Sequence, residues 1–165
     1  YRTVEISVGA PVAPADFAGF YRGELPRVFR AAYLLTGDRQ LAMDVAQEAF
    51  ERAFARWRRL SGEAWSGGWV MTTALNLARR RLRGRREVVG PDPDTTASGP
   101  DESRVDLVRA LAALPFRQRQ ALVLHYVGDL DTAAVAEVMR VSEGTVKAHL
   151  AQGRAALRRK LEVRS

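Results

Sequence analysis

The last third of the chain carries polar and charged side chains at helical intervals, between residues typical of helix ends. The pattern predicts two short helices joined by a tight turn, and Ser142 can cap the second helix by accepting a hydrogen bond from the backbone N–H of Gly144 or Thr145. Val146 and Leu150 give that helix an apolar face. Its exposed side chains can contact base edges or phosphates of DNA: Glu143, Lys147, His149 and Gln152.

This spacing is typical of a helix-turn-helix unit whose second helix enters the major groove of DNA. An ordinary helical hairpin with a solvated outer face has the same spacing, so the segment alone leaves both interpretations open.

A second group of basic residues follows two tryptophans, Trp65 and Trp69. The stretch from Asn76 to Arg86 is rich in arginine and has no acidic residue. On a helix, one side of this stretch would carry Asn76, Arg79, Arg80 and Arg83. Arginines contact phosphates and aromatic rings stack on unpaired bases, which favours single-stranded or locally opened DNA as a partner. The alternative is that the tryptophans are core residues and the arginines aid solubility.

A polar stripe precedes this stretch. Asp44, Gln47, Glu48 and Glu51 are spaced three or four residues apart, so they share one face of a helix. Paired carboxylates can do acid–base chemistry, but no nucleophile lies near them in the sequence, and a solvated face explains the spacing as well. No metal-ligand spacing and no phosphate-binding loop is present. We therefore expect no enzyme activity, no metal and no cofactor.

Composition narrows the class of partner. The chain has 165 residues, 47% of them hydrophobic, and a net charge of +7, which favours a polyanionic partner, either nucleic acid or an anionic membrane. It has no cysteine, which excludes disulfides and is compatible with the cytoplasm, where we expect the protein to act. No apolar run is long enough to span a bilayer, and we expect no membrane partner.

The apolar periodicity predicts an all-α fold with two small helical domains. We expect a flexible N-terminal arm at 1–14, a helical domain at 15–86, a flexible acidic linker at 87–105 rich in Pro and Gly, and a second helical domain at 106–165 that contains the helix-turn-helix.

Within the first domain, Asp16 can cap a helix that Pro26 kinks or divides, and Asp38 can cap the next one. The expected later elements are a helix at 39–60, a Gly-rich loop at 61–68 and a helix at 69–83.

These segments resemble one family over nearly the whole chain. The run Thr36-Gly-Asp-Arg-Gln-Leu-Ala-Met-Asp-Val-Ala-Gln-Glu-Ala-Phe50 is similar to a conserved segment of extracytoplasmic-function (group 4) RNA polymerase sigma factors. Asn76-Leu-Ala-Arg79 resembles the end of the same domain, and its sequence is most similar to that of the actinobacterial SigE-like branch. Gly144-Thr-Val-Lys147 resembles the promoter-reading helix of the family's C-terminal domain.

The resemblance implies a sigma factor that binds core RNA polymerase, recognises two promoter elements and promotes DNA melting. It implies a sigma region 2-like first domain and a sigma region 4-like second domain, with the β′ clamp helices and the β flap of polymerase as docking sites, promoter DNA as ligand and an anti-sigma factor as a further partner. The implied core polymerase-binding residues are Asp44, Gln47 and Glu48.

The same resemblance assigns two DNA-binding sets. For the minus-ten element it implies Trp65, Asn76, Arg79, Arg80 and Arg83. For the minus-thirty-five element it implies Glu143, Thr145, Lys147, His149, Gln152 and Arg154.

Two departures from the family pattern matter. Arg140 stands in the turn where Gly is frequent, so we expect a less tight turn, and Arg80 stands where many members carry Asp. The alternative function is a LuxR-like helix-turn-helix transcription regulator that acts without docking on core polymerase, because Thr145-Val-Lys-Ala-His-Leu150 fits that group too.

Overall fold

The computed structural model describes residues 13–88 and 102–162, which form helices and short connections with no β-strand among them. This confirms the predicted all-α class. In chain order the helices are α2 (Ala13–Thr36), α3 (Arg39–Ala55), α4 (Trp57–Leu60), α5 (Ser66–Val88), α6 (Glu102–Ala112), α7 (Phe116–Leu122), the π-helix η2 (Val123–Val127), α8 (Thr132–Met139) and α9 (Glu143–Glu162).

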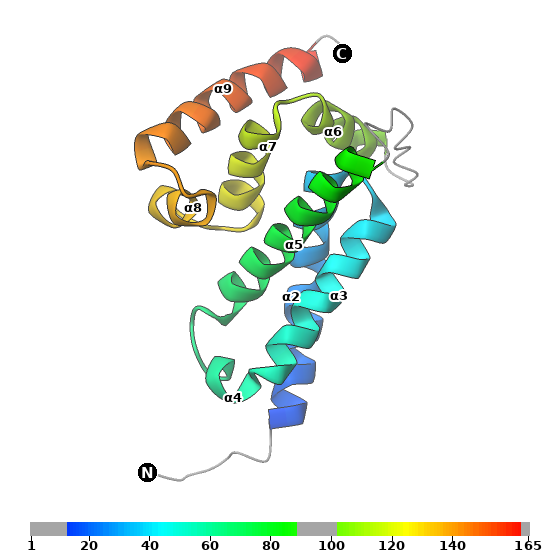
Figure 1. Cartoon of the computed structure of the whole chain (residues 1–165), viewed down its shortest axis with the longest axis vertical. Helices are drawn as coiled ribbons and strands as arrows, with labels where there is room; N and C mark the ends of the chain where they lie inside the picture. The colour runs from blue at the N-terminus through cyan, green and yellow to red at the C-terminus, as the bar shows by residue number, and fades with distance from the viewer. Residues whose placement is uncertain (1–12, 89–101, 163–165) are drawn as a thin grey trace.

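The N-terminal module, α2 to α5, is a bundle of three long helices. α2, α3 and α5 pack along one another, and α4 closes the end of the bundle (Figure 1). Asp38 caps α3 as predicted, since its side chain accepts a hydrogen bond from the backbone N–H of Leu41 at 3.0 Å. Fully buried apolar residues such as Phe50 and Met71 fill the space between the helices.

The C-terminal module, α6 to α9, packs α9 across α7 and α8 (Figure 1). Gly153 lies at the closest point of this packing. A Cβ atom there would lie 2.9 Å from Leu122 Cδ1, so a larger residue would push α9 away from α7. The position of α9 against α7 therefore depends on a glycine within α9.

Arg119 links the two modules. Arg119 is 7% exposed, and its guanidinium donates through Nη1 to the carbonyl oxygen of Leu35 at 2.8 Å. Leu35 lies in the last turn of α2, where carbonyls have no partner within the helix and a cation is favourable. α2 also contacts α6 and η2, and buried apolar residues of both modules form one continuous core.

Several predicted boundaries differ from the structure. Asp16 lies inside α2 and not at its start, and Pro26 is accommodated within the same helix. The predicted 39–60 helix is interrupted at Arg56, where the backbone leaves the helical region between α3 and α4. Residues 87, 88 and 102–105 of the predicted linker are helical, and so are residues 13 and 14 of the predicted arm. The rest of the arm, residues 1–12, and of the linker, residues 89–101, lie outside the described residues.

The predicted Gly-rich loop ends earlier than expected, because α5 begins at Ser66. The Ser66 hydroxyl donates to the carbonyl oxygens of Leu60 and Glu63, which fixes the start of the helix. Gly67 lies at a close approach between helices: a Cβ atom there would lie 3.1 Å from the carboxylate of Glu24, whose side chain would have to move by a few tenths of an ångström. The glycine therefore indicated a close approach to α2 and not a loop.

Candidate nucleic-acid interface

The second helix of the helix-turn-helix presents most of its predicted DNA-reading side chains to solvent. Ser142 caps α9 as predicted, accepting a hydrogen bond from the backbone N–H of Thr145 at 3.1 Å. Val146 and Leu150 are buried against the module. On the opposite face the exposed residues are Glu143, Lys147, Gln152 and Arg154.

The other two members of the predicted minus-thirty-five set are less accessible. Thr145 and His149 are half-buried, and His149 Nδ1 is buried with no hydrogen-bond partner among the described residues. Some exposed members already have partners within the chain. Glu143 accepts from the Thr132 hydroxyl at 2.9 Å, and Arg154 donates to the Tyr126 hydroxyl at 3.0 Å. Lys147 is thus the exposed cation of this face that is best placed to contact a phosphate.

The turn before α9 is as tight as a glycine turn, which corrects our expectation from Arg140. Arg140 adopts a left-handed backbone conformation with φ 57° and ψ 48°. Its backbone N–H and that of Val141 both donate to the Ala136 carbonyl, as in a helix end that normally uses glycine. An arginine in this conformation costs about 1 kcal/mol more than glycine would.

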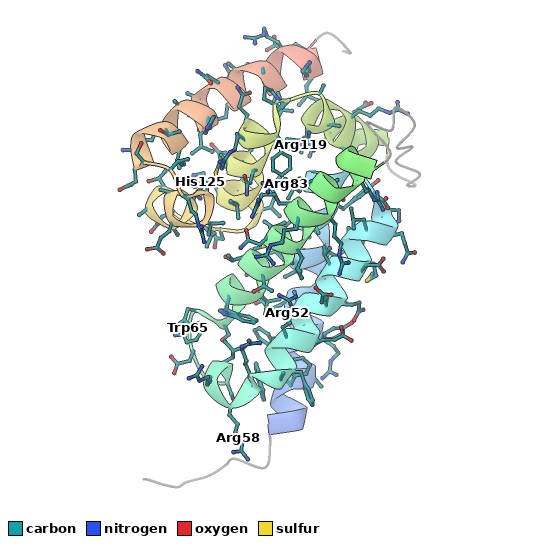
Figure 2. All side chains as sticks on the ribbon, viewed as in Figure 1. Arg52, Arg58, Trp65, Arg83, Arg119 and His125 are labelled. Atoms are coloured by element: carbon teal, nitrogen blue, oxygen red, sulfur yellow. The ribbon has the colours of Figure 1, made fainter. Side chains whose placement is uncertain are left out.

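Four members of the predicted minus-ten set lie together on α5. Asn76, Arg79, Arg80 and Arg83 line one side of a groove whose other side comes from α7 and α8. Arg83 points toward the C-terminal module (Figure 2). Partial burial lowers the pKa of Arg79 most, followed by the charges of neighbouring arginines on both sides of the groove.

Trp65, the fifth member, lies elsewhere. It is 52% exposed on the connection before α5, well separated from Arg83 (Figure 2). Its indole Nε1 donates to Glu63 Oε2 at 3.1 Å, and its ring lines a shallow depression with Trp69 and Leu130. An exposed ring in a depression can stack on an unpaired base. Trp57, by contrast, is a core residue.

The predicted polymerase-binding stripe lies on the surface of α3. Asp44 and Gln47 are exposed, and Glu48 is half-buried. Glu48 accepts from Arg81 of α5 at 2.8 Å and from Arg52 at 3.2 Å, so it also fixes α3 to α5. Asp44 and Gln47 are therefore accessible to a partner, whereas Glu48 is held by two partly exposed ion pairs.

Comparisons with known proteins match both modules. Residues 20–88 match the family model Sigma-70 region 2, and residues 104–157 match Sigma-70, region 4. The chain is 32% identical over 168 residues to the ECF RNA polymerase sigma factor SigL of Mycobacterium tuberculosis, an alignment that covers 95% of both proteins.

This chain belongs to the ECF RNA polymerase sigma factors.

Two further similarities agree with this assignment. The sigma factor is 30% identical over 164 residues to the ECF RNA polymerase sigma factor SigE of Mycolicibacterium smegmatis, covering 92% of this chain and 64% of that protein. Its fold matches that of the sigma factor RpoE of Bartonella quintana, solved in complex with the anti-sigma factor NepR, with a TM-score of 0.77 at 23% identity over 90% of this chain and 98% of that one. The region 2 match favours the sigma-factor prediction over the LuxR-like alternative.

Sequence reasoning missed three residues that this sigma factor places beside the predicted minus-ten set. Arg117 and Gln120 of α7 and Arg140 of the turn line the same groove as Arg79 and Arg83. Arg140 was visible as an unusual residue in the turn. The other two had no signal, because their proximity to α5 depends on how the modules pack.

Proposed function

We propose that the two modules of this sigma factor have separate binding functions, with module boundaries near those predicted from the sequence. The N-terminal module would bind core RNA polymerase and the minus-ten element, and the C-terminal module would bind the minus-thirty-five element. The observation that carries this proposal is α9, which is capped by Ser142 and presents Glu143, Lys147 and Gln152 to solvent after a tight turn.

Polymerase binding is assigned to the α3 stripe of Asp44, Gln47 and Glu48. The exposure of Asp44 and Gln47 on the α3–α5 pair supports this role, since a docking surface needs accessible side chains on a fixed backbone. The β′ clamp helices are the proposed contact of this stripe, and the β flap is the proposed contact of the C-terminal module.

Promoter opening is assigned to α5 and the connection before it. Extruding a base from the duplex costs a few kcal/mol of stacking. The exposed ring of Trp65 can return part of this free energy by stacking, and Arg80 and Arg83 can hold the adjacent phosphates. All of these steps are binding steps, so the sigma factor would act without catalysis of its own.

Two further elements of the proposal come from the family. We place the sigma factor in the cytoplasm, where core polymerase acts. Because RpoE of Bartonella quintana was solved with an anti-sigma factor, we propose that a protein of this class also controls the present chain.

Transcription in vitro tests the function. Core polymerase with this chain is expected to initiate at defined promoters, and sequencing of the transcript starts would identify both elements. Tight binding to duplex DNA without any binding to core polymerase would instead support a regulator of the LuxR-like kind.

A further inference from the structure

The groove between the two modules is built almost entirely from cationic and apolar side chains. We name it the arginine groove. It has a volume of about 620 Å³ and is lined by Asn76, Arg79, Arg80, Leu82 and Arg83 of α5, Phe116, Arg117 and Gln120 of α7, and Val138, Met139 and Arg140 of α8 and its turn. No carboxylate is among these lining residues. Guanidinium groups therefore face one another from opposite sides of the groove, and a bound anion would relieve their repulsion.

The charge of the groove is not neutralised elsewhere in the described residues. On the same helix, Arg81 pairs with Glu48 at 2.8 Å and Arg85 pairs with Asp38 at 2.7 Å. No such ion pair joins an arginine of the groove to a carboxylate in the part of the chain that the structure describes. The lowered pKa of Arg79 reflects its partial burial first and then the charges of Arg83, Arg80, Arg117 and Arg140.

Two residues that line the groove each carry a local cost to stability. Arg140 adopts the left-handed conformation that glycine would adopt more easily. Gln120 is 1% exposed, and its Oε1 is buried with no hydrogen-bond partner among the described residues. Arg117 is fixed by donating to the Met139 carbonyl at 3.1 Å, so the C-terminal wall is ordered before any ligand arrives.

We propose that the arginine groove binds a compact polyphosphate anion, such as a nucleoside triphosphate. Guanidinium forks suit phosphate oxygens, and several phosphates in a row can contact arginines from both walls at once. Phe116, Val138 and Met139 supply an apolar wall against which a base could pack. The volume lies within the range of small-molecule sites.

A single DNA strand is the competing occupant of this groove. The predicted minus-ten set lies on α5 and on the connection before it, whereas the groove adds Arg117 and Arg140 from the other module. A compact anion can bridge both walls in the packed arrangement of the modules. Polyphosphate binding goes beyond the proposed promoter function and does not require polymerase.

Isothermal titration calorimetry on the full chain tests the proposal. The probes are inorganic tripolyphosphate, ATP and AMP. Tripolyphosphate and ATP are expected to bind, with AMP at least tenfold weaker because it has one phosphate. Equal affinity for tripolyphosphate and ATP would assign the site to the phosphates alone, and tighter binding of ATP would show that the base contributes. Both results support the proposal.

Three variants locate the site. Arg140→Gly keeps the backbone conformation of the turn, and it and Arg117→Ala are each expected to weaken tripolyphosphate binding about tenfold. Arg58→Ala removes an equal charge from an exposed position at the far end of the N-terminal module (Figure 2) and is expected to change it less than twofold. A cooperative thermal unfolding transition of the Arg140→Gly variant would confirm that this variant is folded.

Three results would overturn the proposal. One is no binding of tripolyphosphate at low ionic strength. Another is an equal loss of affinity in Arg58→Ala and Arg140→Gly, which would mean non-specific charge attraction. The third is binding of a single-stranded minus-ten oligonucleotide that requires Arg117 and Arg140 and that tripolyphosphate does not compete for.

Discussion

Replacing Arg119 by Ala should destabilise the whole chain. The guanidinium donates to the Leu35 carbonyl at 2.8 Å and, through Nη2, to the carbonyls of Ala112 and Leu114 at 3.4 Å. A hydrogen bond from a charged donor is worth about 1.5–3 kcal/mol. Counting the short bond at about 2 kcal/mol and the two long ones at about 1 kcal/mol together, we expect a loss of about 3 kcal/mol.

A loss of this size is readily measured by thermal unfolding, followed by far-UV circular dichroism. For a chain of this length about 3 kcal/mol corresponds to a fall in Tm of roughly 6–12 °C. Arg119→Lys should fall between Ala and the native chain, because an ammonium cannot fork to three carbonyls. Arg109→Ala, an exposed arginine of α6, is the matched control and should change stability by less than about 0.5 kcal/mol. If Arg119→Ala unfolded within a degree of the native chain, the interface role of Arg119 would be wrong.

Three other predictions concern the surface. Asp44→Ala with Glu48→Ala should weaken binding to core polymerase in a pull-down while the helical circular dichroism stays unchanged, since the lost contacts are two partly exposed ion pairs of Glu48 and one exposed hydrogen bond of Asp44; unfolding of the double variant would show that the stripe is structural. Lys147→Ala should weaken minus-thirty-five binding and lower the slope of log K against log salt by about 0.9, and an unchanged slope would remove Lys147 from the phosphate contacts. Asp38 has a lowered pKa, because hydrogen bonds from the Leu41 backbone and Arg85 outweigh the effect of burial, which raises it. Its contribution to stability is present above the unfolded pKa near 3.8 and is lost as the pH falls through the lower folded value, so the stability gap between native chain and Asp38→Asn in urea should shrink below pH 4.

Local signals in the sequence correctly predicted two helix caps and the apolar face of α9, although they misplaced several helix boundaries. Ser142 and Asp38 were identified as caps from residue type and position alone, and each accepts a backbone hydrogen bond in the structure. The apolar face of α9 was predicted from Val146 and Leu150, which are buried. These features succeed because a helix cap and a helical face depend on residues within four positions of one another.

Contacts between distant segments were not predictable in the same way. Arg119 binds a backbone carbonyl 84 residues away. Every residue has a backbone carbonyl, so the sequence does not indicate which one accepts this hydrogen bond. Gly67 was misread for a related reason: it serves a close approach to Glu24 of another helix, and its local effect on the chain resembles that of a loop residue. The arginine groove falls in the same class, because it exists only through the packing of α5 against α7 and α8.

The net charge of +7 gives no hint of how unevenly the cations are used. Neighbouring arginines of α5 have opposite surroundings because successive residues of a helix face different directions. Arg81 and Arg85 turn toward the carboxylates of α3 and its cap, and they join helices. Arg79 and Arg83 turn toward the cations of the C-terminal module. The first pair joins α5 to α3 and its cap. The second pair faces other cations across the groove, which opposes the packing of the modules. An anionic ligand, whether polyphosphate or promoter DNA, would relieve this repulsion.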